Sequence, residues 1–293
     1  MKKFIKNNWF VLLVIIIFSG IVFYEDNNFI NDMKRNDEFV QSSLIKCQNE
    51  KSTSTEESFA DFCDRINKNK DVKVDFYTML SNVLYSNVRY INLFAFLILI
   101  IPSLIIPSKL LKYNLLKKVK SKENYQSFIV KFIKSAFKYI WLLPLLALII
   151  ILPIALLTTF DPTYSILYNT SIWTGNIIYH PIMFIALYIL NIFLYSCIFI
   201  NISLIILRKQ HNYILAIILS FLCYVGIELF LEVAVNVEIS NLFNIISPFM
   251  FSNQFGIENL LIFTFVVFGI SILGLYLSYR NKEKLIIDCK NNK

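Results

Sequence analysis

The sequence predicts an all-α membrane protein with six transmembrane helices. Hydrophobic residues make up 57% of its 293 residues and charged residues only 16%, whereas soluble domains carry about a quarter charged residues. The apolar residues gather in six stretches, each close to the roughly 20 residues that cross a bilayer. Between these stretches, Lys and Arg lie in blocks, which is a signal of membrane topology. The stretches are Trp9–Tyr24, Tyr90–Pro107, Tyr139–Phe160, Ile182–Leu207, Tyr213–Ala234 and Asn259–Tyr279.

The first stretch is the shortest, and Lys2, Lys3 and Lys6 precede it, so a signal peptide is the alternative to a membrane anchor. A signal peptide ends in small residues of the A-x-A type. This stretch ends instead in the bulky residues Phe23 and Tyr24. We therefore expect an uncleaved first helix, with residues 1–24 forming the N-terminal tail and this helix.

The distribution of Lys and Arg predicts that both termini lie in the cytoplasm of a bacterial cell. With six spans, 19 of the 28 basic residues fall on one side, which then carries a net charge of +16. The loops 161–180 and 235–258, on the other side, contain no Lys or Arg. Short loops rich in Lys and Arg stay in the cytoplasm. The net charge of +8 thus reports topology, and we expect no nucleic-acid partner.

Residues 25–89 predict an extracytoplasmic helical domain between the first two spans. Apolar residues recur near helical spacing at both of its edges, and its centre is polar and turn-like, which favours a helical hairpin. Cys47 and Cys63 flank this centre, in a compartment that permits disulfides. We expect a bridge between them, the alternative being two reduced cysteines.

No catalytic constellation is present in the sequence. The chain has no Walker A loop, no H-E-x-x-H and no G-x-S-x-G motif. Its two histidines and five cysteines show no metal-site spacing. We therefore expect no enzymatic activity, no cofactor and no metal, and energy for any transport must come from a partner or a gradient.

Residues 108–138, within the five-helix region 90–293, predict a cytoplasmic elbow. From Tyr125 to Phe137 the apolar residues recur at i, i+3, i+4 and i+7, which indicates one face of an amphipathic helix before the third span. One interpretation is a helix held at the membrane surface by anionic lipid. The other is that the preceding turn couples to a cytoplasmic ATPase, through the candidates Lys118, Lys120, Lys122, Glu123, Asn124 and Tyr125.

The fourth and fifth predicted spans carry polar residues that are candidates for a substrate pathway. Ionisable groups inside a membrane are functional candidates because they cost about 2.5–3.5 kcal/mol at its centre. The alternatives are solvated carboxylates at a helix end and hydrogen bonds between neighbouring helices. The candidates are Glu228, Glu232, Tyr224, Ser220, Asn191 and Tyr195.

Two local stretches resemble those of the ABC-2-type permeases, the membrane subunits of bacterial ABC exporters. They are KENYQSFIVKFIKSAFKY at Lys122–Tyr139 and NIISPFMF at Asn244–Phe251. The resemblance implies that the elbow contacts an ATPase subunit and that the last outer loop re-enters the membrane. It also implies two permease chains, identical or different, with two ATPase subunits. The short tail before Trp9 departs from the amphipathic helix that commonly begins these permeases.

Three functions are compatible with these patterns. The first is an ABC permease that exports an amphipathic peptide or a lipid-like molecule, of the kind linked to peptide export or self-immunity. The second is a membrane-anchored sensor or immunity protein whose domain at residues 25–89 binds an extracellular ligand. The third, an ion-coupled carrier that uses Glu228, lacks the internal inverted repeat that such carriers show.

Overall fold

A computed structural model of the chain describes residues 2–50, 63, 73–85, 88–118, 125–168, 171, 176–210, 212–234 and 257–280. Almost all of these residues are helical, and no strand occurs among them. One isolated bridge pairs Asp75 with Thr159. The predicted all-α class is therefore confirmed for this part of the chain.

The helices follow the predicted apolar stretches closely. The fifth stretch and α9 share the same bounds, and the fourth and sixth differ from α8 and α11 by at most three residues at either end. The elements are α1 (Lys2–Glu50), α3 (Phe76–Tyr85), α4 (Val88–Lys118), α5 (Tyr125–Ala136), η1 (Phe137–Tyr139), α6 (Leu142–Leu157), α7 (Thr163–Tyr168), η2 (Asn176–Tyr179), α8 (Pro181–Gln210), α9 (Tyr213–Ala234) and α11 (Ile257–Tyr279).

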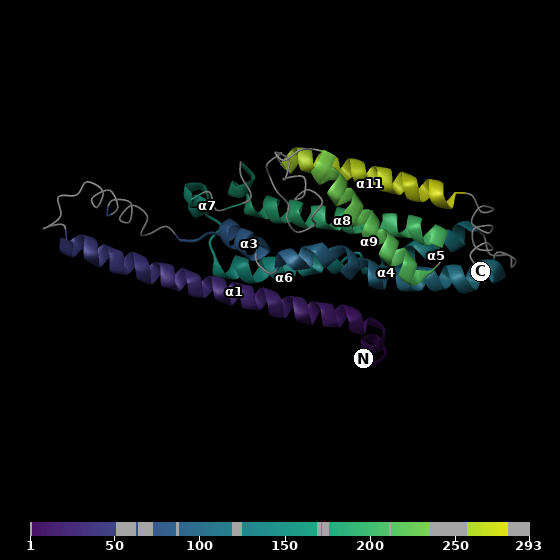
Figure 1. Ribbon diagram of the computed structural model, residues 1–293, viewed down its shortest axis with the longest axis horizontal. Coiled ribbons are helices and arrows are strands. Elements are labelled where there is room, and N and C mark those ends of the chain that lie inside the picture. The colour runs from purple at the N-terminus through teal and green to yellow at the C-terminus, as the bar shows by residue number, and fades with distance from the viewer. Residues whose placement is uncertain are drawn as a thin grey trace.

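Helix α8 is the centre of the bundle. It packs against α4, α6, α9 and α11, and 56% of its most apolar stretch is buried. Helix α11 has its main contact with α8, and only 17% of its apolar stretch is buried. Figure 1 shows α11 (yellow) on one side of the bundle and α1 (purple) on the other. The outward faces of α1 and α11 carry exposed apolar side chains, as expected for helices in contact with lipid.

Helix α1 continues without a break from the first predicted span into the predicted outer domain. Its 49 residues correspond to a length of about 73 Å at 1.5 Å per residue, whereas the hydrocarbon layer is about 30 Å thick. Figure 1 shows its far end extending past α3 and α7. The helical prediction is confirmed for residues 25–50 and for α3, and the boundary placed at residue 24 lies inside one continuous helix.

Four helical segments are long and apolar enough to cross a membrane: Trp9–Arg35, Tyr125–Leu157, Pro181–Gln210 and Leu261–Tyr279. Two further apolar segments, Ala95–Leu111 and Tyr213–Gly226, are shorter. Each of these six segments overlaps one predicted span, although Tyr125–Leu157 also includes α5 of the predicted elbow and Trp9–Arg35 extends past Tyr24. The number of membrane crossings and the side on which each terminus lies stay predictions.

Helix α4 runs past the predicted end of the second span. Pro102 and Pro107 lie inside it, although proline removes a backbone donor and ends most helices. Prolines are tolerated in apolar helices where neighbouring groups satisfy the backbone. Each proline removes the N–H partner of the carbonyl four residues earlier, which is that of Ile98 for Pro102 and of Ser103 for Pro107. Near them the Tyr213 hydroxyl of α9 donates to the Ile101 carbonyl at 2.7 Å, and the Ser108 hydroxyl donates to the Ile105 carbonyl at 2.9 Å. These bonds hold the same part of α4 but do not replace the lost ones.

The two ends of the bundle differ in charge. We call one the basic end, because α4, α8 and α11 finish there next to the residues Lys109, Lys118, Arg208, Lys209 and Arg280. The opposite end contains α3, α7 and η2, with Asp75 and Asp161 beside them. Helix α5 lies at the basic end, packed against α4.

Candidate functional site at the basic end

Tyr279, the last residue of α11, joins three helices at the basic end. Its hydroxyl donates a hydrogen bond to the Leu204 carbonyl of α8 at 2.7 Å. Its own carbonyl accepts a hydrogen bond from the Tyr125 hydroxyl of α5, also at 2.7 Å. Carbonyls in the last turn of a helix have no partner within that helix, so Tyr125 satisfies a group that α11 leaves open.

Ring contacts strengthen the same connection. The rings of Tyr279 and Phe132 of α5 lie with centroids 5.2 Å apart. The Arg208 guanidinium of α8 lies over the Tyr279 ring at 5.8 Å, within the range of a cation–π interaction. Tyr279 is only 4% exposed. We call this group, Tyr125, Phe132, Leu204, Arg208 and Tyr279, the tyrosine junction.

Helix α5 has the amphipathic character that its sequence predicts. Phe128, Phe132 and Ala136 are buried, and Lys131 and Lys134 lie on the exposed face. The buried face packs against α4 and the tyrosine junction. A membrane-surface helix would turn this face to lipid, whereas here the face belongs to the protein core.

The structure describes only part of the predicted coupling group. Tyr125 begins α5 and bonds to Tyr279, and Lys118 is the last residue of α4. Lys120, Lys122, Glu123 and Asn124 lie outside the described residues. Segment 119–124, outside the described residues, therefore joins the end of α4 to the start of α5. The first side chain of α5, that of Tyr125, contacts α11.

The predicted pathway candidates Asn191 and Ser220 are both buried and hydrogen-bonded. The Asn191 side-chain oxygen accepts a hydrogen bond from the Thr264 hydroxyl of α11 at 3.1 Å. The Ser220 hydroxyl donates to the Ala216 carbonyl of its own helix at 2.6 Å. Ser220 is fully buried and Asn191 nearly so. Of the alternatives open in the sequence, these bonds favour contact between helices for Asn191.

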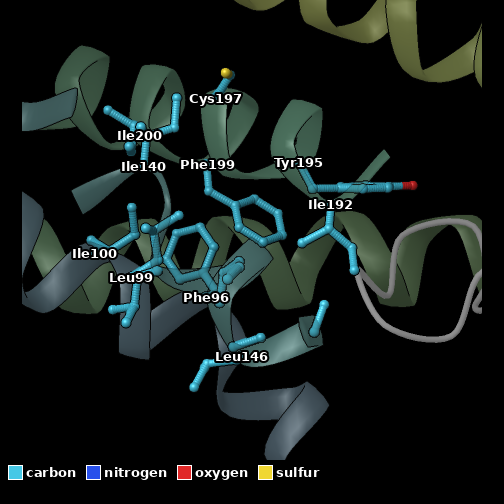
Figure 2. Close-up of a cluster of buried hydrophobic side chains, with 14 of the residues drawn as sticks. Phe96, Leu99, Ile100, Ile140, Leu146, Ile192, Tyr195, Cys197, Phe199 and Ile200 are labelled. Carbon is cyan, nitrogen blue, oxygen red and sulfur yellow. The ribbon is translucent and has the colours of Figure 1, made fainter. Parts of the chain in front are cut away.

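Tyr224 and Tyr195 belong to a buried aromatic cluster between α4, α8 and α9. The Tyr224 ring stacks on Phe96 with centroids 5.1 Å apart and meets Phe199 edge-on at 5.4 Å. The Tyr195 ring lies 6.0 Å from Phe199. Figure 2 shows the rings of Phe96 and Phe199 next to one another, in an edge-on contact, while the hydroxyl of Tyr195 points away from them. Both tyrosines are 5% exposed.

Glu228 and Glu232 lie in the last turns of α9, and their side chains are outside the described part of the structure. Their role in a pathway stays a prediction. The predicted re-entrant segment, residues 244–251, also lies outside the described residues.

At the opposite end, Cys47 of α1 is bonded to Cys63 by the predicted disulfide, with Cα atoms 5.7 Å apart.

A buried aromatic group joins the first residues of α3 to Phe160 and to Phe184 of α8. The Phe76 ring contacts Phe160 at 4.8 Å, and the Tyr77 ring contacts Phe184 at 5.2 Å. Burial, together with the nearby Asp75 carboxylate, raises the pKa of Tyr77 from 10.0 to about 12.

Sequence reasoning missed Tyr279, Arg208 and Asp75. Tyr279 ends an apolar run directly before Arg280, and tyrosine at such a boundary is typical of the membrane interface, so its position carried a signal. Its contacts with α5 and α8 depend on chain segments 154 and 75 residues away. A pattern within one stretch does not report contacts of that range.

Among the described residues, no group of three or more His, Cys, Asp or Glu side chains is placed to hold a metal ion. Comparison with known protein families, with curated proteins and with solved structures finds no match to this chain.

Proposed function

We propose that the chain is the membrane-spanning permease subunit of an ABC transporter in a bacterial cytoplasmic membrane, with both termini in the cytoplasm. A separate ATPase chain binds segment 119–124, and a second permease chain completes the pathway. The cargo is an amphipathic peptide or a lipid-like molecule that leaves the cell. The observation that carries the proposal is the tyrosine junction, which connects the helix after this segment to α8 and α11.

The junction supplies a mechanical reason for this assignment. A partner that moves segment 119–124 acts directly on Tyr125, the first residue of α5. Tyr125 is hydrogen-bonded to Tyr279 of α11, and the ring of Phe132, two turns later in α5, contacts the ring of Tyr279. Because Tyr279 is also bonded to α8, a displacement of α5 is transmitted to the central helix of the bundle. Packed interfaces transmit such shifts between discrete arrangements.

Site-directed photo-crosslinking in native membranes tests the proposal. A photoreactive residue replaces Lys122 in the segment, and a matched control replaces Lys46, which is exposed near the far end of α1. We expect the Lys122 position to capture a protein with a Walker A sequence and the Lys46 position to capture none. The proposal is overturned if neither position captures an ATPase and transport survives charge reversal at Lys118, Lys120 and Lys122.

The length of α1 favours one alternative, a membrane-anchored sensor or immunity protein. Residues 25–89 hold 12 acidic and nine basic residues, so this segment suits a cationic amphipathic peptide. Hydrogen exchange of the full chain with and without such a peptide separates the two functions. Protection confined to residues 36–50, with no captured ATPase, would support the sensor.

A further inference from the structure

Three lysines form an exposed stripe along α5 and η1. Lys131, Lys134 and Lys138 are all exposed, and their spacing of three and four residues places them on one face of the helix. We call this group the basic stripe. Lys109, on the adjacent helix α4, is exposed too. From Tyr125 to Trp141 the sequence contains no Asp or Glu, so every charged residue of this segment is basic.

An exposed tryptophan, Trp141, and a half-buried tyrosine, Tyr139, follow the stripe directly. Trp141 is 64% exposed and lies against Phe193 of α8 with centroids 4.9 Å apart. The Lys138 ammonium lies 5.1 Å from the centre of the Tyr139 ring. Tryptophan and tyrosine gather at the level of the lipid headgroups. This places Lys138 at the polar edge of the apolar layer and the other two lysines just outside it.

The length of the apolar segment that contains α6 agrees with this level. The segment from Tyr139 to Thr158 supplies the roughly 20 residues that cross the hydrocarbon layer. Its far end meets the opposite end of the bundle, where the Thr159 carbonyl accepts a hydrogen bond from the Phe76 N–H at 2.8 Å. The apolar layer therefore ends near Tyr139, and the basic stripe begins there.

We propose that the basic stripe binds the headgroups of anionic phospholipids. The ammonium groups pair with lipid phosphates, while Trp141 contacts the upper part of the acyl chains. The positive charge of the three lysines and their level at the edge of the apolar layer both favour anionic lipid headgroups. A cytoplasmic protein would contact the first turn of α5, at Tyr125. The basic stripe instead extends away from that turn, from Lys131 toward exposed Trp141. Val130, 62% exposed beside Lys131, likewise fits a surface that borders lipid.

Fluorescence of Trp141 measures this binding directly. The chain has three tryptophans, so a Trp9→Phe, Trp173→Phe background leaves Trp141 as the reporter. The purified protein is reconstituted in phosphatidylcholine containing a fraction of brominated phosphatidylglycerol, which quenches nearby tryptophan. The converse mixture contains the same two lipids but carries the bromine on phosphatidylcholine, and its quenching of Trp141 is the reference. We expect phosphatidylglycerol to be preferred at least about fivefold, the factor that one lysine near an anionic surface supplies.

Three variants identify the stripe as the cause. Lys131→Gln, Lys134→Gln and Lys138→Gln combined should abolish the preference, and the corresponding triple arginine variant should keep it. The matched control, Lys34→Gln with Lys46→Gln, removes two exposed lysines of α1 and should leave the preference unchanged. Circular dichroism of every variant checks that the helices are intact. Raising the salt concentration should weaken the preference through screening.

Several results would overturn the proposal. One is equal quenching by the two brominated lipids in the parent protein. Another is a glutamine variant that retains the preference. Competition by inorganic phosphate beyond that of chloride at equal ionic strength would assign the stripe to a soluble anion. A glutamine variant that keeps the lipid preference but loses a bound ATPase would assign it to a protein partner.

Discussion

The Asp75 carboxylate accepts a hydrogen bond from the backbone N–H of Ser165, 90 residues later in the chain, at 2.8 Å. Its other oxygen accepts one from the Thr78 N–H, also at 2.8 Å. Asp75 is fully buried. One carboxylate therefore caps the first turns of both α3 and α7, where N–H groups lack partners and negative charge is favourable. This contact ties the start of α3 to the start of α7.

Asp75→Ala should destabilise the protein. The substitution removes two hydrogen bonds to a charged group and leaves two buried N–H groups without that acceptor, which we expect to cost about 3 kcal/mol of unfolding free energy. Unfolding in detergent micelles measures this loss. Asp161→Ala is the matched control, because Asp161 caps the same helix α7 through Thr163 at an exposed site. A similar loss in both variants would contradict the role of Asp75.

Tyr77→Phe should stabilise the protein at neutral pH by about 1 kcal/mol. The Tyr77 hydroxyl is buried and has no hydrogen-bond partner among the described residues, and an unsatisfied buried polar group is unfavourable. The measurement is again the free energy of unfolding. Tyr179→Phe, at a residue 58% exposed, is the control and should change little. A destabilised Tyr77→Phe would show that the hydroxyl has a favourable contact.

The pH dependence of the protein's stability provides a second check on Tyr77 and its neighbour Asp75. The pKa of Tyr77 is raised from 10.0 to about 12, chiefly by burial and further by the Asp75 charge. Folding therefore favours the neutral phenol. This contribution is complete below pH 10 and is lost as the pH rises through about 12. Stability should fall less steeply over this window in Tyr77→Phe than in the parent.

The sequence predicted the helices well because hydropathy is a local property. The apolar run from Tyr213 to Ala234 and the amphipathic period from Tyr125 each report one helix, and both helices are present. The cysteines flanking a polar turn predicted the Cys47–Cys63 disulfide. In each case the residues that determine the feature lie close together in the chain.

Contacts between distant segments were beyond prediction. Pro107 suggested the end of the second span, but packing against α9 and α5 lets α4 continue to Lys118. For Asn191 the sequence left open a pathway or a bond to a neighbouring helix, and it did not identify Thr264 as the partner. The Ser220 bond stays within α9, and the role of both residues in a pathway stays a prediction. The tyrosine junction arises from three segments brought together.

Thiol counting tests the disulfide in the purified chain. The protein has five cysteines, of which Cys47 and Cys63 are bridged. Denatured but unreduced protein should therefore bind three maleimides, and reduced protein five. Breaking the bridge should lower stability by about 3 kcal/mol, as the chain-entropy estimate for a loop of this length indicates. Five reactive thiols before reduction would refute the bridge.

Two glycines of α11 should respond differently to larger side chains. A Cβ atom at Gly274 would lie 3.2 Å from the Ile205 Cδ1 atom of α8, whereas one at Gly269 would meet no atom within 4 Å. Gly274→Val should therefore cost about 1–3 kcal/mol by overpacking. Gly269→Ala should stabilise the helix by up to about 1 kcal/mol. Equal effects in unfolding measurements would mean that α11 does not pack on α8 through Gly274.

Tyr125→Phe tests whether the tyrosine junction transmits movement. The substitution removes only the hydroxyl that bonds the Tyr279 carbonyl, so we expect a loss of about 1 kcal/mol in stability. Tyr279→Phe removes the bond to Leu204 and should cost a similar amount. Because both bonds hold one residue, their effects should be non-additive in a double-mutant cycle.

Under the proposed function, Tyr125→Phe should leave capture of the ATPase at position 122 unchanged while substrate-stimulated ATP hydrolysis falls. If capture falls as well, Tyr125 belongs to the docking surface. Normal stimulation in both single variants and in the double variant would show that the junction stabilises the bundle without coupling it to ATP hydrolysis.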